Sequence, residues 1–271
     1  MAKCVMCGRR GLFLKLSQAG LCASCEVVAR KQLYEEGQRK AQEAVARHRS
    51  EFSAQLAAIP AVPVCVDGQK VPVRSLDGFY DLKYSSVTSR SRRDSLGGYI
   101  ALDIETAGLK ATDAILEVSA VLFSDFVPQS IFTSLVRPSG PIPAAATKVN
   151  GITDDMVVSA PYFWQILPSL QAFVGNRPLV GHNLPFDLKF LYRRGFDVQP
   201  KQKLYDTLEI SQRHLKRAND SGTNDWDVLD HKLETVCKYY GIYIDGAHRS
   251  ASDAFATGLL FARLVQDRTR P

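Results

Sequence analysis

Residues 99–109 read Tyr-Ile-Ala-Leu-Asp-Ile-Glu-Thr-Ala-Gly-Leu, an apolar run that carries two acids, Asp103 and Glu105. The apolar residues before the acids are typical of a β-strand buried within a sheet. Because Asp103 and Glu105 alternate with Ile104, both carboxylates project from the same face of such a strand. The stretch therefore predicts a central strand that presents a pair of acids to one site.

The residues around this strand predict an α/β domain over residues 99–271. Strand patterns recur at 115–123, 131–136 and 179–181. Helical patterns lie at 163–173, 185–194, 207–217, 232–240 and 252–265. Three strands in succession, followed by alternation of strand and helix, predict a mixed sheet with helices on both faces.

Two further segments contribute acids and a histidine. Asp187 ends the run Gly-His-Asn-Leu-Pro-Phe-Asp at 181–187, and His248 and Asp253 begin and end the run His-Arg-Ser-Ala-Ser-Asp. Clustered carboxylates repel one another, and bound hard cations relieve that repulsion. Two Mg²⁺ or Mn²⁺ ions about 3.5–4 Å apart supply what phosphodiester hydrolysis needs: charge neutralisation, an activated water and a stabilised leaving group. The four acids can together bind such a pair of ions.

In these segments the chain resembles the DEDDh (DnaQ-like) 3′→5′ exonucleases, the family of the proofreading epsilon subunit of bacterial DNA polymerase III. The resemblance spans about residues 99–267 and rests on three motifs in order, at 103–109, 182–191 and 248–253. Supporting segments of the same family lie at 149–157, 204–208 and 232–242. The sequence departs from the family pattern at Ala107, where Thr is usual, and at Ser250, where Ala is usual; neither departure removes a ligand.

The resemblance implies an RNase H-like fold, with a mixed five-stranded sheet flanked by helices, and it assigns roles to the acids. Asp103, Glu105, Asp187 and Asp253 would hold the two metal ions, and His248 would be the general base on the attacking water. An imidazole with an unperturbed pKa of about 6.5 is mostly neutral at working pH, as that role requires. The implied reaction releases nucleoside 5′-monophosphates from single-stranded 3′ ends, with DNA favoured as substrate and RNA as the alternative.

The resemblance also implies substrate contacts. Thr106, Gly108 and Leu109 would contact the terminal nucleotide, with Leu109 as a wedge between the last bases. Asn183 and Phe186 are further candidates, although Asn183 and the neighbouring His182 are expected mainly to orient the loop before Asp187. For Phe186 and Phe190 a place in the core is favoured over stacking on a base. Asp206 fits either a supporting role beside the site or a helix N-cap.

Four of the six cysteines form two Cys-x-x-Cys pairs, Cys4 with Cys7 and Cys22 with Cys25, separated by 14 residues. This pattern, in a chain that starts without a secretory leader, indicates a tetrahedral site for one structural Zn²⁺. Redox-active or incidental cysteine pairs are the alternative. Residues 1–25 are thus predicted to be a zinc-ribbon-like module, in which Leu12, Phe13, Leu14 and Leu16 supply a hairpin with apolar cover.

Residues 26–60 predict one long helix, because the stretch is rich in Ala, Glu, Gln, Lys and Arg and is closed by Pro60. Its thin apolar seam suits either a weak coiled coil, through which the chain would self-associate, or an arm packed on another surface. Residues 61–84 predict at most a small hairpin around Asp67-Gly68. The Ser/Arg-rich residues 85–98 predict a flexible spacer, with phosphate contact as an alternative.

The chain has 271 residues and a net charge of +6, of which residues 1–60 carry +5, residues 61–98 carry +2 and residues 99–271 carry −1. This mild basic excess is compatible with a nucleic-acid partner and equally with a solvated surface. There is no long apolar run, so no membrane partner and a cytoplasmic location are expected. The competing function is a binding adaptor in which the ribbon and helix recruit nucleic acid or a protein. Removal of residues 1–98 is expected to spare hydrolysis of short oligonucleotides.

Overall fold

The computed structural model describes residues 1–218 and 227–269. Contacts divide the chain into two compact units, an N-terminal unit of Met1–Ser50 and a C-terminal unit of Glu51–Pro271. Each unit has its own packed interior, and they are described separately below.

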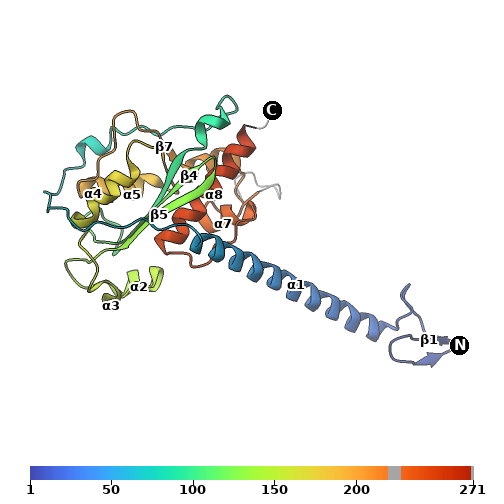
Figure 1. Ribbon diagram of the computed structural model, residues 1–271. Coiled ribbons are helices and arrows are strands. Elements are labelled where there is room, and N and C mark those ends of the chain that lie inside the picture. The colour runs from blue at the N-terminus through green and yellow to red at the C-terminus, as the bar shows by residue number, and fades with distance from the viewer. Residues whose placement is uncertain (219–226, 270–271) are drawn as a thin grey trace. The chain divides into compact units, whose positions relative to one another are not determined.

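The C-terminal unit is built on a mixed five-stranded sheet in the order β5-β4-β3-β6-β7 (Figure 1). β3, β4 and β5 pair antiparallel, whereas β6 runs parallel to β3 and β7 runs parallel to β6. The strands are β3 (Tyr99–Thr106), β4 (Ile115–Ser124), β5 (Val127–Leu135), β6 (Leu179–Gly181) and β7 (Leu204–Asp206). The predicted mixed five-stranded sheet is therefore confirmed.

Two strands differ from the sequence prediction in detail. β5 begins at Val127 rather than at 131, because Asp125 and Phe126 both have positive φ, of 49° and 63°, and close a tight hairpin directly after β4. β7 was not predicted as a strand, because three residues are too few to show an alternating pattern. Its partner β6 is equally short, but its run of apolar residues stands out.

Helices cover both faces of the sheet. Five helices match predicted segments within a few residues: α4 (Phe163–Val174), α5 (Leu184–Arg193), α6 (Thr207–His214), α7 (Leu233–Tyr239) and α8 (Ser250–Arg268). Two short helices were not predicted, α2 (Ala144–Asn150) and α3 (Asp154–Val157). No helix in the described ranges is both long enough and apolar enough to span a bilayer.

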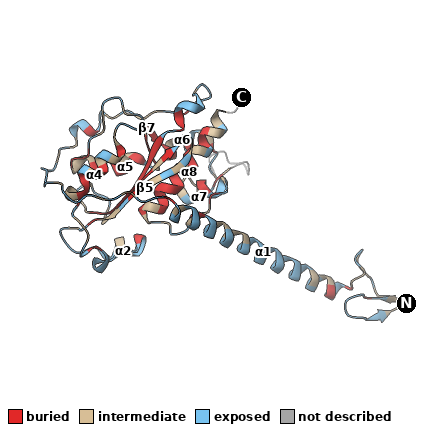
Figure 2. Cartoon of the chain, viewed as in Figure 1, coloured by how far each residue is buried: buried red, intermediate tan, exposed pale blue. Residues whose placement is uncertain are grey.

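Buried residues gather on the sheet and on the helices that cover it (Figure 2). The alternation of side chains along β3 divides this core into two layers. Tyr99 and Ala101 pack with α8 on one face, and Ile100 and Leu102 pack with α4 and α5 on the other. α8 lies so close to the sheet that a Cβ on Gly258 would approach within 2.1 Å of the Phe123 ring. By the same alternation, the acids of β3 face the α8 side of the sheet.

Residues 51–98 pack onto the rest of the C-terminal unit. The hairpin expected at 61–84 and the spacer expected at 85–98 do not form. No strand forms in this segment; Ala61 makes a single bridge to Ile131 in β5. Its backbone N–H groups instead donate to carbonyls elsewhere in the unit, such as that of Leu204. Five of its apolar side chains are buried: Phe52, Ile59, Phe79, Val87 and Leu96. The Ser/Arg-rich composition concealed Val87 and Leu96, which fix residues 85–98 in place.

The N-terminal unit consists of a small knuckle, residues 1–22, and most of a long helix. Two-residue strands, β1 (Ala2–Lys3) and β2 (Arg10–Gly11), pair antiparallel, and α1 (Ala23–Ala57) begins three residues before its predicted start. The last turns of α1, from Glu51 onwards, belong to the C-terminal unit. Leu12 and Phe13 are 81% and 97% exposed, so they do not cover the knuckle as predicted. Leu14 and Leu16 do pack against the cysteines.

Candidate active site

The three acids that lie closest together come from β3 and α8. Asp103, Glu105 and Asp253 each offer a carboxylate oxygen, and these oxygens all lie within 4.8 Å of one another. Asp253 occupies the first turn of α8, and that helix packs on the face of β3 from which the two strand acids project. A separation of this size suits shared coordination of a cation by oxygen ligands.

Asp187 approaches from the opposite helical layer. It is buried in the first turn of α5, and its Oδ1 accepts a hydrogen bond of 3.1 Å from the backbone N–H of Ile104. This bond ties the carboxylate to β3 between the two strand acids, although it lies outside the closest group of three. The structure thus brings all four predicted acids to the same segment of β3.

Burial and mutual repulsion make these acids reluctant to ionise. Burial raises the pKa of Glu105 to about 8 and that of Asp253 to about 6, with the neighbouring carboxylates adding to both effects. Burial, followed by the charge of Asp187, raises the pKa of Asp103 well above its usual value. Four partly desolvated carboxylates form a site that favours cations and disfavours isolated negative charge. Their oxygen donors fit Mg²⁺ or Mn²⁺.

His248 lies beside these acids on the loop before α8. Its φ of 62° places it in the left-handed region, and its backbone N–H donates to Asp253 Oδ2 at 3.0 Å. Such a conformation costs a non-glycine residue free energy, so the surrounding contacts must hold it. His248 and Asp253 line a cavity of about 500 Å³, and His182 and Asn183 line it as well. The imidazole thus stands at the edge of the space next to the acids.

A buried acid that the sequence analysis missed anchors this loop. Glu117 in β4 is 3% exposed and accepts hydrogen bonds from Arg249 Nε at 3.1 Å and Nη2 at 2.5 Å. It also accepts from the backbone N–H of Ser250 at 2.9 Å. The residues that follow His248 are therefore fixed to β4. The sequence signal that could have identified Glu117 is that it is the single acid within the apolar run 115–123.

The predicted substrate-contacting residues of the first motif form a turn after β3. Thr106 Oγ1 donates to the carbonyl of Gly108 at 2.7 Å. A Cβ at Gly108 would lie 2.3 Å from the Asp113 carboxylate, so a larger residue there would have to displace that side chain. Leu109 is 80% exposed and is therefore free to contact a ligand.

The second motif is organised around two supporting side chains. Asn183 has a φ of 67° and donates its N–H to Asp206 Oδ1, which also caps α6 through the N–H of Leu208. Asp206 therefore supports the loop that precedes Asp187 and also caps α6, the two roles that the sequence offered as alternatives. The ring of His182 bonds Thr207 Oγ1 at 3.0 Å and the His231 carbonyl at 2.8 Å, and burial lowers its pKa to about 4. Both ring nitrogens of His182 are therefore engaged within the protein.

The two aromatic candidates of this motif lie side by side. Phe190 is fully buried, while Phe186 is partly buried and packs against it with ring centroids 4.9 Å apart. Phe190 therefore belongs to the core. Phe186 retains an accessible part.

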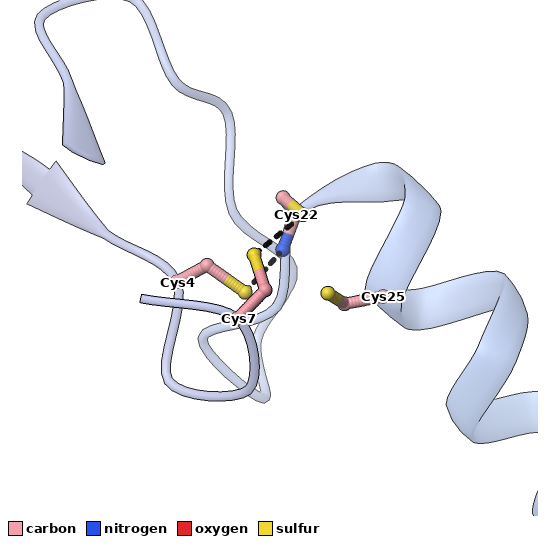
Figure 3. A group of neighbouring side chains, drawn as sticks. All are labelled: Cys4, Cys7, Cys22 and Cys25. Carbon is pink, nitrogen blue, oxygen red and sulfur yellow. Dashed lines mark hydrogen bonds between the residues drawn. The ribbon is translucent and has the colours of Figure 1, made fainter. Parts of the chain in front are cut away.

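In the N-terminal unit, Cys4, Cys7, Cys22 and Cys25 point toward a common centre (Figure 3). Their sulfur atoms all lie within 4.8 Å of one another, and those of Cys7 and Cys22 are 3.8 Å apart. Tetrahedral coordination with Zn–S bonds of about 2.3 Å places sulfur atoms about 3.8 Å apart. The N–H of Cys22 donates to Cys4 Sγ and lowers the pKa of the Cys4 thiol to about 6. The cluster can therefore hold a metal ion.

The sheet order, the two helical layers and the acids at the end of the central strand define an RNase H-like exonuclease fold. The family model described as exonuclease (RNase_T) matches residues 100–261, and the chain belongs to this family. The family match begins after residues 1–99, which include the cysteine cluster and α1.

Sequence relatives include DNA polymerase III PolC-type of Caldanaerobacter subterraneus, 31% identical over 183 residues, which is 66% of this chain and 12% of that protein. The PolC-type polymerase of Bacillus subtilis is 32% identical over 174 residues, covering 62% of this chain and 11% of the relative. The chain thus matches only about an eighth of the length of these polymerases. Escherichia coli exonuclease I, solved with a dA16 oligonucleotide, has a TM-score of 0.51 at 19% identity over 64% of this chain and 41% of its own.

Proposed function

We propose that this protein is a metal-dependent 3′→5′ exonuclease that releases nucleoside 5′-monophosphates from single-stranded ends. The observation that carries the proposal is the convergence of Asp103, Glu105 and Asp253 within 4.8 Å, next to Asp187 and His248. Carboxylates spread over 150 residues meet at one strand end, and their burial disfavours them as isolated charges. Bound cations offset that cost.

The proposed division of roles is the one that the family resemblance implies, and the positions of the side chains support it. Asp103, Glu105, Asp187 and Asp253 would hold two Mg²⁺ or Mn²⁺ ions. Such ions neutralise the phosphate oxygens, activate water and stabilise the leaving group. His248, at the cavity edge, would accept the proton from the attacking water, and the Glu117–Arg249 pair would keep it there. The exposed Leu109 and the partly accessible Phe186 would hold the terminal nucleotide.

DNA is the proposed substrate. The chain matches part of PolC-type DNA polymerases, and exonuclease I of similar fold was solved with a DNA oligonucleotide. RNA remains the alternative, since discrimination depends on contacts to the sugar 2′ position.

Matched DNA and RNA oligonucleotides, labelled at the 5′ end, test the function directly. With Mg²⁺ or Mn²⁺ we expect a ladder of products shortened one nucleotide at a time from the 3′ end, formed faster from DNA. A 3′-terminal phosphorothioate of matched sequence should slow the first cleavage. Folded protein that produces no ladder with either metal and either substrate contradicts the proposal, and a faster RNA ladder reverses the substrate preference.

We further propose that the four cysteines hold one structural Zn²⁺. All four positions are sulfur donors, so no place is left for a reactive water, as in structural sites. Cys4, Cys22 and Cys25 are buried at the centre of this small packing cluster, whereas Cys7 is exposed.

Removal of this metal is expected to unfold the ribbon and leave the C-terminal unit folded, because the knuckle has little other core. Purified protein should contain about one zinc per chain by elemental analysis, and Cys22→Ser should lower that content sharply. Cys65→Ser, at an exposed cysteine outside the cluster, is the matched control and should retain the metal. Equal zinc content in the two variants would contradict the assignment.

A further inference from the structure

A segment that precedes the family match is fixed across the helices of the C-terminal unit. This segment, residues 65–74, is called the strap. The N–H of Cys65 donates to Ser169 Oγ at 3.2 Å, and the N–H of Gly68 donates to the Gln165 carbonyl at 3.0 Å. A Cβ at Gly68 would lie 2.1 Å from the Trp164 carbonyl oxygen, so the strap lies directly on α4.

The other end of the strap is held at the end of α5. The N–H of Arg74 donates to the Arg193 carbonyl at 2.9 Å, and its guanidinium pairs with Asp197 at 2.6 Å. Gly195 has a φ of 97°, and a Cβ there would lie 2.8 Å from Val71. The residues between these attachments, Lys70 to Val73, are therefore held at a defined place.

These residues form one wall of a second cavity, of about 530 Å³, which is separate from the cavity beside His248. The other walls come from the turn before β4, the loop after β5, the start of α4 and Arg194. Three of the lining side chains are cationic, Lys70, Arg137 and Arg194, and none of the described residues that line it is an acid. The cavity is therefore suited to anions.

Arg194 contributes positive charge to this cavity, and the partners of its guanidinium are backbone carbonyls. It donates to the carbonyls of Ala111 and Phe190, each at 3.0 Å, and to that of Asp113. Burial lowers its pKa to about 10, so the group is still protonated at neutral pH. The same bonds attach the turn before β4 to the end of α5.

Aromatic side chains stand beside these cations. The rings of Tyr162 and Trp164 are nearly parallel, with an interplanar angle of 9° and centroids 5.9 Å apart. The guanidinium of Arg137 lies 5.5 Å from the centroid of Tyr162. Both aromatic residues line the cavity and are partly exposed. Cations that track phosphates and aromatic faces that stack on bases are the combination that binds single-stranded nucleic acid.

The cavity and the acids lie at the same end of the sheet. Ile115, which lines the cavity, pairs with Thr106, the residue after Glu105. Thr112 also lines the cavity, and its Cα lies at most about 11 Å from that of Leu109, because three residues span no more than that. The loop between β3 and β4 therefore carries the proposed contacts to the terminal nucleotide near its start and lines this cavity at its end.

We propose that this cavity binds the single strand upstream of its 3′-terminal nucleotide, with Lys70 and Arg137 on the phosphates and Trp164 against a base. The inference rests on the proposed function, because it assumes that the terminal nucleotide occupies the acid site. The strap thus adds to the exonuclease domain a substrate contact that begins outside the family match.

Paired-charge removal tests the proposal in the full-length protein. Lys70→Gln/Arg137→Gln should bind a hexanucleotide of deoxythymidine about tenfold more weakly at low salt than wild type, measured by anisotropy in EDTA. The slope of log affinity against log salt should become shallower by about 1.4, because each of the two phosphates that is no longer neutralised accounts for roughly 0.7. Lys203→Gln/Lys238→Gln removes two exposed charges outside the cavity and should change neither quantity.

A second readout locates the base. Hexanucleotide binding should quench tryptophan fluorescence, and Trp164→Phe should abolish most of that quenching. With metal added, the charge variant should lose about tenfold in kcat/KM on the hexanucleotide, and less on a dinucleotide, which has a single nucleotide upstream of the terminal one. Wild-type-like binding, salt slope and quenching in these variants overturn the cavity assignment. If wild type cleaves neither substrate, the proposed function fails, while the binding measurements still decide the cavity.

Discussion

Asp103→Asn is expected to lower the rate of single-strand hydrolysis by at least about 10³-fold while the protein stays folded. Asp103 stands among Asp187, Asp253 and Glu105, all of which raise its pKa, and this crowding is what a bound cation relieves. The amide keeps the shape of the side chain but removes the negative charge that would hold the metal. The measurement is kcat/KM on a labelled oligonucleotide with Mg²⁺, together with thermal unfolding in EDTA.

The unfolding temperature in EDTA should be equal to or above that of wild type, because the substitution removes a partly desolvated charge from a group of like charges. In wild type, Mg²⁺ should raise the unfolding temperature, since it binds only the folded site, and Asp103→Asn should lose most of this shift. Asp125→Asn makes the same chemical change in the β4–β5 turn, at the other end of the sheet, and should leave activity unaltered. Activity within tenfold of wild type in Asp103→Asn would exclude the proposed metal site.

Removal of residues 1–98 is expected to unfold the C-terminal unit, whereas removal of residues 1–50 should leave it folded and active on short oligonucleotides. Five buried apolar side chains lie between the two end points. Burial of each side chain contributes about 1.5–3 kcal/mol. The sum for the five is comparable to the whole free energy of unfolding of a domain, roughly 5–15 kcal/mol. Circular dichroism and dinucleotide hydrolysis of the two truncated chains provide the comparison. This expectation replaces the one drawn from composition, in which the whole of 1–98 was dispensable.

A pair of point variants in the full-length chain separates packing from chain length. Leu96→Ala removes a side chain that is 5% exposed and should cost about 2–5 kcal/mol of stability. Leu229→Ala removes one that is 65% exposed and should cost no more than about 0.5 kcal/mol. Equal unfolding temperatures for the two variants, or a folded and active chain of residues 99–271, would show that residues 85–98 act only as a spacer.

Local patterns predicted the elements that carry chemistry. β3 was recognisable because a buried strand shows as an apolar run, and the spacing of Asp103 and Glu105 placed both acids on one face before any fold was known. Helices with strong periodicity, such as α5 and α8, were predicted within a few residues of their ends. Composition misled where a few apolar residues sit among polar ones, as with Val87 and Leu96, because burial depends on what they meet and not on their neighbours in sequence.

By itself the sequence determined the family motifs, the mixed sheet and the identity of the acids, since these follow from residue type and short spacing. Only the tertiary structure decided which distant groups touch. Glu117 holds the segment after His248, and the strap brings Lys70 to a cavity shared with Arg137 and Trp164. Such contacts join residues up to 133 positions apart, and no local pattern records them, because they arise only when the sheet brings its strand ends and covering helices together.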